Sequence, residues 1–269
     1  TLTAIGGTTG SSGNFQWGTG TTIGSNIISG QTSASIYVNP TTTTTYWVRR
    51  YDAGNCNQAT SGVTFTITVS QPSTAPTTIS GTTSICAGSS TTLTVSGGTH
   101  GTGATYQWGT GWTVGSNIIS GATSSSISVS PTTNTVYWVR RIDPSPCNNS
   151  TSGVTTTVNV TNPSTAPTSI TGGEATACYN TSRVLTANGA TLASGANYQW
   201  GTGTVIGSNV ISGQTGASIT VNPSTTTTYW VRVKDNTTPC TAYTAGTSTT
   251  VVVATRPGTP ASFGNNPWH

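Results

Sequence analysis

Five cysteines have the clearest capacity for chemistry in this sequence, because paired thiols form disulfides and clustered thiols bind zinc. Two intervals between them are nearly equal, 61 positions in one case and 62 in the other. This constant spacing predicts two disulfides, Cys86–Cys147 and Cys178–Cys240, and therefore an oxidising compartment. Zinc is the alternative, but the chain has no C-x-x-C pair and its two histidines do not recur with the cysteines.

The fifth cysteine, Cys56, has no counterpart at this spacing. Its partner would fall near position −5, just before Thr1. We therefore expect Cys56 to pair with a cysteine upstream of Thr1. On this interpretation the sequence begins inside a domain. The alternative is a disulfide between Cys56 and a second molecule.

Residues suited to catalysis are sparse. The chain has four acids, three of which (Asp52, Asp143 and Asp235) occupy the same place after an Arg-bearing segment. General acid–base pairs and calcium sites need several converging oxygens, and nucleophilic triads need a positioned histidine. The sequence therefore predicts no enzyme, no metal site and no cofactor. A GTG-x-x-x-G string resembles a phosphate loop only superficially, since no Lys or helix follows it, and hairpin glycines are the better interpretation.

Aromatic residues recur in two places. In the string Y/F-Q-W, period-2 alternation puts both aromatics on one face, so we expect Trp17, Trp108 and Trp200 to fill a core. Thirty residues later a Y-W-V-R string should point a second Trp and an Arg to the other face. Either the Arg covers the indole as a cation–π pair under a neighbouring loop, or the pairs form an exposed stripe that binds sugar or protein. The residues of that stripe would be Trp47, Arg49, Trp138, Arg140, Trp230 and Arg232.

These strings recur because the chain repeats itself. The core tryptophans are 91 and then 92 positions apart, which is the size of a small domain. Within the middle copy, residues 91–97, 105–110, 125–131, 135–142 and 153–160 read as strands separated by turn residues. We predict an all-β array of three immunoglobulin-like antiparallel sandwiches, the first lacking its N-terminal strand. The expected domains are 1–72, 73–163 and 164–256, and residues 257–269 are a linker with the start of a further module.

Composition narrows the functional classes. Only 4% of residues are charged and the net charge is +4, too dilute for a nucleic-acid surface. No apolar run is long enough for a membrane span. Pro-containing linkers at 71–78, 162–169 and 256–261 should be short and stiff, so the copies should form a rod.

The concatenated motif resembles immunoglobulin-like tandem repeats of large Bacteroidota cell-surface adhesins. It comprises FQW (15–17), SIYVNPTTTTTYWVRR (35–50) and the openings ICAGSSTTLT (85–94) and ACYNTSRVLT (177–186). The resemblance implies type IX secretion and display on the outer surface, as in gliding-motility adhesins. It also implies a stalk that carries a binding head outside this segment.

We therefore expect a mechanical spacer on the bacterial cell surface. Its partners would be the secretion and attachment machinery and an extracellular glycan or protein ligand, the latter bound through other parts of the molecule. Two alternatives remain open: an extracellular filament subunit that accepts a strand at an open sheet edge, and a carbohydrate-binding or spacer module of a secreted enzyme.

Overall fold

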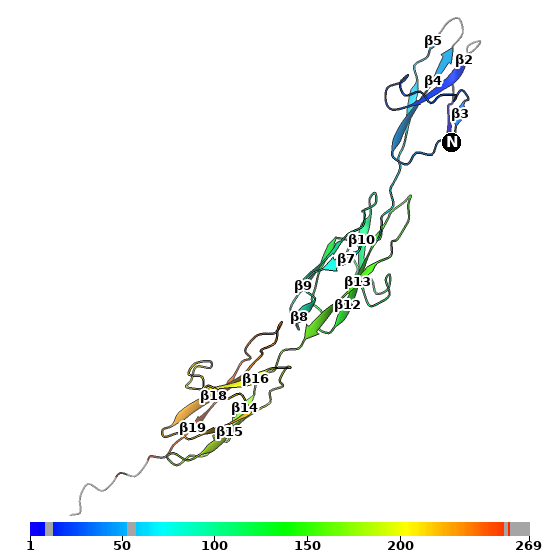
Figure 1. The fold of residues 1–269 in the computed structure, drawn as a ribbon. Coiled ribbons are helices and arrows are strands. Elements are labelled where there is room, and N and C mark those ends of the chain that lie inside the picture. Colours follow the sequence, from blue (N-terminus) through cyan, green and yellow to red (C-terminus); the bar gives the residue numbers. More distant parts are fainter. Residues whose placement is uncertain (9–12, 53–57, 256–257, 259–269) are drawn as a thin grey trace, which may run out of the picture.

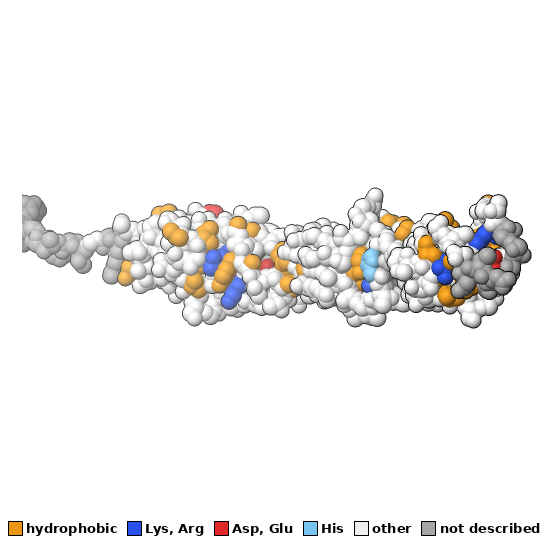
Figure 2. All heavy atoms as spheres, turned by 90° about the horizontal axis from the view of Figure 1, so that it is seen from above, with side chains coloured by type: hydrophobic (Ala, Val, Ile, Leu, Met, Phe, Trp, Pro, Cys, Tyr) orange, Lys and Arg blue, Asp and Glu red, His pale blue; other side chains and the backbone are white. Residues whose placement is uncertain are grey.

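A computed structural model describes residues 1–8, 13–52, 58–255 and 258. Three β-rich bodies, called repeats 1, 2 and 3 below, follow one another in a row (Figure 1). No helix of the described residues could cross a membrane. Figure 2 shows an elongated surface dominated by uncharged side chains, with few and scattered Lys and Arg groups.

Repeat 2 is the most complete copy. Its strands are β7 (Thr78–Ser80), β8 (Ser84–Cys86), β9 (Thr91–Ser96), β10 (Thr105–Thr110), β11 (Ser126–Val129), β12 (Thr135–Ile142) and β13 (Val154–Thr161). They form one sheet in the order β10-β12-β13-β8 and a second in the order β11-β9-β7. The five strands predicted from the middle copy are confirmed. The parallel pairing of β8 with β13 departs from the purely antiparallel expectation.

Repeat 3 has the same two-sheet plan. Its strands are β14 (Ser169–Thr171), β15 (Arg183–Asn188), β16 (Asn197–Thr202), β17 (Ser218–Val221), β18 (Thr227–Lys234) and β19 (Thr247–Val251). One sheet has the order β16-β18-β19 and the other β14-β15-β17. Residue Ala177 forms an isolated parallel bridge to Val253, where repeat 2 has β8 beside β13.

Repeat 1 contains β1 (Leu2–Thr3), β2 (Gly13–Thr19), β3 (Ser35–Ile36), β4 (Thr44–Asp52), β5 (Gln58–Ala59) and β6 (Val63–Ile67). Strand β4 pairs with β2, β5 and β6, and β1 pairs with β3. Among its described residues, repeat 1 has no counterpart of β7 or β8, in agreement with the predicted lack of an N-terminal strand.

The core of each repeat lies between its two sheets. In β9 every second residue is buried, which is the period-2 signal of a strand with one solvated face. Trp17, Trp108 and Trp200 are at most 3% exposed and belong to the three core clusters. Each indole N–H donates to a carbonyl oxygen at 2.9 Å, so no buried donor is left unsatisfied there.

Candidate functional site: the junctions between repeats

The second set of tryptophans does not form an exposed stripe. Trp47, Trp138 and Trp230 are at most 1% exposed. They do lie on the other face of the strand, as alternation predicts, but the loop that follows β2, β10 or β16 covers them. Each indole N–H donates to a Ser carbonyl in that loop, at 2.9 to 3.0 Å. The proposed ligand surface is therefore wrong for all three tryptophans.

The arginines beside them complete the cover. In repeat 2 the guanidinium carbon of Arg140 lies 5.8 Å from the centre of the Trp138 ring, and its Nε donates to Gln107 at 2.8 Å. The same contacts recur at Arg49 and Arg232, at 5.6 Å from their indoles. The cation–π interpretation is thus the one the structure bears out.

The repeated G-T-G string ends β10 and leads into this loop. A Cβ at Gly109 would lie 2.1 Å from the Trp138 ring, so the indole packs directly on bare backbone. Gly111 and Gly115 have φ values of 89° and 97°, the left-handed region that glycine tolerates best. No helix follows these residues, so the string is scaffold and forms no phosphate loop.

The recurrent aspartates tie each linker to the repeat that follows it. Asp143 is 3% exposed and accepts hydrogen bonds from the backbone N–H of Ser73 at 2.8 Å and from its hydroxyl at 2.5 Å. Gly101 then donates its N–H to the Ser73 hydroxyl oxygen at 2.9 Å. We call this arrangement the Ser–Asp latch. It fixes the linker from repeat 1 against the start of repeat 2.

A second Ser–Asp latch holds the next linker. Ser164 donates both its N–H and its hydroxyl to Asp235, which is 4% exposed. Ala193 donates its N–H to the Ser164 oxygen at 2.9 Å, as Gly101 does in repeat 2. Two of the four acids of the chain are therefore committed to inter-repeat linkers, a role that the sequence analysis did not assign to them.

The first latch has an electrostatic consequence. The hydrogen bonds from the Ser73 hydroxyl and N–H hold the pKa of Asp143 below its usual value, outweighing the desolvation that would raise it. A depressed pKa means that the folded state prefers the carboxylate. The latch is therefore fully formed above the ordinary carboxyl pKa and weakens as pH falls through the lowered one.

Further contacts hold the linker between repeats 1 and 2. Gln71 donates its side-chain N–H to the Thr41 carbonyl of repeat 1 at 2.6 Å, while its backbone exchanges hydrogen bonds with Thr102 of repeat 2. The buried guanidinium of Arg141 donates to the Thr74 carbonyl at 2.6 Å and to the Gly97 carbonyl at 2.7 Å. Gln71 therefore bonds to both repeats, and the guanidinium of Arg141 in repeat 2 holds the linker.

The cysteines contradict the predicted pairing. The disulfide joins Cys86 of repeat 2 to Cys240 of repeat 3, with the Cα atoms 5.3 Å apart, and Cys147 and Cys178 are free thiols. Both predicted disulfides, Cys86–Cys147 and Cys178–Cys240, are wrong. The prediction for Cys56 and, except at residue 258, the prediction for residues 257–269 lie outside the described part of the chain.

Strand direction explains the error. Cys86 ends β8, which runs parallel to β13 and pairs with it at Thr161, the last residue of β13. Cys147 lies in the loop before β13, because β12 and β13 are antiparallel neighbours. An eight-residue strand spans about 25 Å, far more than the roughly 7 Å limit for a disulfide's Cα atoms. Equal spacing revealed equivalent positions in the two repeats, and those positions lie at opposite ends of each sandwich.

Cys240 is placed to reach across the junction. It is 3% exposed, and its sulfur lies 3.3 Å from the carbonyl oxygen of Thr161 at the end of repeat 2. The disulfide therefore links the distal end of repeat 2 to the proximal end of repeat 3. We call this bond the inter-repeat staple.

Repeat 1 has an apolar groove of about 410 Å³ that includes Leu2, Trp17 and Phe65 in its lining. Val63 and Phe65 of β6 are 68% and 61% exposed there. Strand β6 corresponds to β13, whose open edge is occupied by β8 in repeat 2. Val63 and Phe65 both line the groove, so the groove adjoins β6, whose one partner strand among the described residues is β4.

Two packed sheets with a buried Trp on a central strand recur in this chain, and they decide its fold class. The chain is a tandem array of immunoglobulin-like sandwiches. Residues 75–162 match the model of a Domain of unknown function (DUF8696). No curated protein is similar to the chain in sequence.

Structure comparison matched solved structures of low sequence identity and low TM-score. One of Sidekick-1 immunoglobulin domains 1-5 is 11% identical with a TM-score of 0.38, over 90% of this chain and 52% of that one. One of Sidekick-1 domains 1-4 is 12% identical with a TM-score of 0.42, over 91% and 68%. The mouse nectin-like molecule 4 ectodomain is 14% identical with a TM-score of 0.33, over 78% and 72%. The chain thus spans about half of the first structure.

Proposed function

We propose that this chain is a stiff spacer in an exported bacterial surface adhesin, which holds a binding head away from the cell. The observation that carries the proposal is the inter-repeat staple between Cys86 and Cys240. A disulfide between two domains adds nothing to a binding pocket, but it resists their separation under load. It also requires an oxidising compartment, which supports an extracellular location.

The junction contacts support the same role. Both linkers are tied to the following repeat by a Ser–Asp latch, and the repeats lie in a row (Figure 1). A linker held at a buried carboxylate moves less freely against the repeat that follows it, because movement there must break charge-assisted hydrogen bonds. Type IX secretion and a place in gliding or surface attachment remain part of this proposal, on the basis of the sequence resemblance.

We propose no catalytic activity for the segment. In support, two of its four acids are hydrogen-bonded to linker serines in the latches. A spacer in a secreted enzyme would need the same mechanical properties, so that alternative differs only in what the spacer carries. Sugar binding at the recurrent Trp and Arg stripe is not proposed again, because the indoles are buried.

The filament alternative keeps one favourable observation among the described residues, the apolar groove of repeat 1. Val63 and Phe65 of β6 are exposed in its lining, and an exposed apolar strand is the kind of surface that accepts an added strand. It predicts ordered polymers of the chain. A monodisperse monomer at high concentration would count against it.

The spacer role is tested by exchanging one repeat in the parent protein. Residues 73–163 are replaced by an unrelated rigid domain of the same length, or deleted, and attachment of cells to their substratum is measured. A spacer predicts that deletion reduces attachment and that the unrelated domain restores it. Failure of the unrelated domain, with normal surface display, would show that length alone does not account for attachment. Because the exchange also removes Cys86, the Cys86→Ser variant of the intact protein then separates loss of the staple from loss of a binding surface.

A further inference from the structure

One half of the inter-repeat staple is defined by a local arrangement around Cys86. The preceding residue, Ile85, pairs in parallel with Val160 of the last strand, and Ala87 donates its N–H to Thr161 at 2.9 Å. The chain then turns, with the N–H of Ser89 donating to the Cys86 carbonyl at 2.9 Å. These contacts hold the thiol at the distal end of repeat 2.

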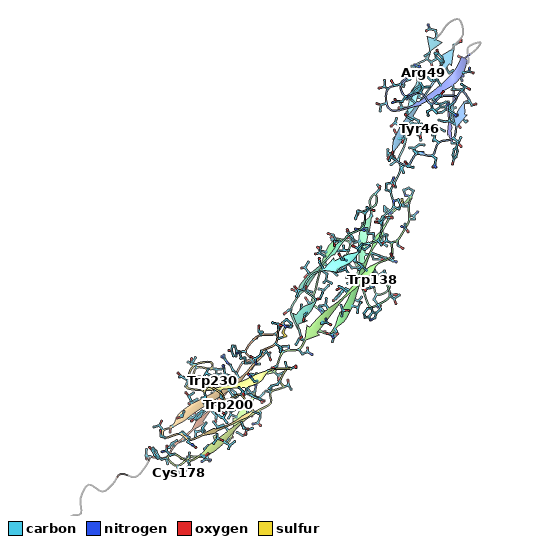
Figure 3. The ribbon with its side chains drawn as sticks, in the orientation of Figure 1. Tyr46, Arg49, Trp138, Cys178, Trp200 and Trp230 are labelled. Carbon is cyan, nitrogen blue, oxygen red and sulfur yellow. A yellow bond between two sulfur atoms is a disulfide. The ribbon has the colours of Figure 1, made fainter. Side chains whose placement is uncertain are left out.

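Cys178 repeats this arrangement at the distal end of repeat 3. Ala177 pairs in parallel with Val253, and Ala254 donates its N–H to the Ala177 carbonyl at 2.9 Å. The N–H of Thr181 then donates to the Cys178 carbonyl at 3.1 Å, which is the same turn. Cys178 is exposed and free, and Figure 3 shows it at the end of repeat 3 that faces away from repeat 2.

The other half of the staple is set by docking and forms without the disulfide. The Cys147 sulfur lies 3.6 Å from the Ser70 carbonyl of repeat 1, just as Cys240 lies 3.3 Å from the Thr161 carbonyl of repeat 2. Cys147 is a free thiol in this posture. The contact between successive repeats therefore presents this loop cysteine to the preceding repeat whether or not a partner thiol is there.

We propose that Cys178 is the open half of a second inter-repeat staple, which accepts the loop cysteine of a further repeat of this type docked on the distal end of repeat 3. Cys147 is the corresponding open half at the proximal end of repeat 2. The inference concerns how repeats are joined and holds whether or not the array is an adhesin stalk.

The bond forms by thiol–disulfide exchange. One thiol loses its proton and attacks a small-molecule or protein disulfide, which releases one thiolate of the oxidant and leaves a mixed disulfide. The second protein thiolate then attacks the protein sulfur of that mixed disulfide and displaces the other thiolate of the oxidant. The two cysteines together lose two electrons and two protons, and the oxidant is reduced to two thiols. Cys178 is exposed, so an oxidant can reach it.

The two staples would overlap along the chain. Cys178 precedes Cys240, so a loop that starts at Cys178 begins inside the loop closed by Cys86–Cys240. Each repeat between two staples would then be bonded to both neighbours by the linker and by a disulfide. Such an array has two covalent paths through every junction, and cutting one linker would not separate the repeats.

The test extends the chain by one repeat. Residues 1–254 are followed by a second copy of residues 162–255, and the protein is refolded in a glutathione redox buffer. Free thiols are alkylated, and the unreduced protein is digested and mapped by mass spectrometry. We expect Cys178 bonded to the copy of Cys240, beside the Cys86–Cys240 bond, with Cys147 alkylated. Cys178→Ser is the matched control and should leave the copied loop cysteine alkylated and Cys86–Cys240 intact.

Alkylated Cys178 in a protein with an intact Cys86–Cys240 bond would overturn the proposal, because that bond reports native docking in the same molecules. A disulfide from Cys178 to a second molecule would overturn it as well. If the extended chain forms neither bond, the unreduced protein from its native source decides. Cys178 bonded to a cysteine of a further repeat supports the proposal, and a free Cys178 thiol contradicts it.

Discussion

Stretching the chain by its two ends tests the mechanical role of the inter-repeat staple directly. The Cys86–Cys240 bond closes a loop with a sequence separation of 154. Tension that enters repeat 2 through β7 and β8 crosses the disulfide at Cys86 and leaves through the chain after Cys240. Everything from β9 to β18 lies inside the loop and cannot be extended while the bond is intact.

The magnitude follows from the length of the closed loop. At about 3.3–3.6 Å for each extended residue, the 154-residue interval hides roughly 500 Å of contour length. We therefore expect the oxidised chain to release that much less length on full extension than the reduced chain. Repeat 1, which lies outside the loop, should unfold with an ordinary step in both. The chain-entropy model adds about 5 kcal/mol to the free energy of unfolding for a loop of this length.

The assay is single-molecule force spectroscopy on the full chain with handles at both ends. Paired Cys86→Ser and Cys240→Ser substitutions should behave like the reduced protein, and Cys147→Ser should behave like the oxidised one. Equal total extension in the oxidised and doubly substituted proteins would refute the reasoning, because it would mean that the staple does not carry the load.

Three further predictions follow from the described contacts. Because the pKa of Asp143 is lowered by Ser73, the Ser73 amide should be protected from exchange above about pH 4, the ordinary carboxyl range. Its protection factor, the intrinsic exchange rate at each pH divided by the measured rate, should fall as pH drops through the lowered pKa. A protection factor that does not change with pH would contradict the latch. Gly201→Ala places a Cβ 2.0 Å from the Trp230 ring and should lower the free energy of unfolding, measured by chemical denaturation, by about 1–3 kcal/mol. The control is Gly216→Ala, whose Cβ would have its nearest contact at 3.5 Å and should leave the free energy of unfolding nearly unchanged. Trp230→Ala should cost about 3–5 kcal/mol in the same assay, and an unchanged stability would show that the indole is not buried.

The regular part of this fold was accessible from sequence. Alternation within residues 91–96 and 135–142 gave the strands and the face of each aromatic, because side chains in a strand point to opposite sides in turn. Alternation does not reveal what covers a face. Trp138 was assigned to the correct side of its strand, but the loop that buries it comes from residues that show no period.

The junctions were the part that sequence could not supply. Cysteine spacing identified equivalent positions, but pairing depends on which end of the sandwich each position reaches, and that depends on the parallel placement of β8 beside β13. The recurrence of Asp143 and Asp235 was visible, and so were the serines of the linkers. Their contact spans about 70 residues of sequence, and no local pattern encodes it.

The two junctions between repeats hold their linkers with partly different side-chain contacts. At the first, Arg141 of repeat 2 is buried and donates to the Thr74 carbonyl of the linker, while Gln71 bonds to both neighbours. At the second, the residue in the place of Arg141 is Val233, which is fully buried and offers no donor. That junction has the staple through Cys240, and at the first junction Cys147 lies in the equivalent place against the preceding repeat. The guanidinium tie is therefore an addition at the first junction, so Arg141→Val should loosen that linker, as measured by amide exchange at Thr74, and leave the second junction unchanged.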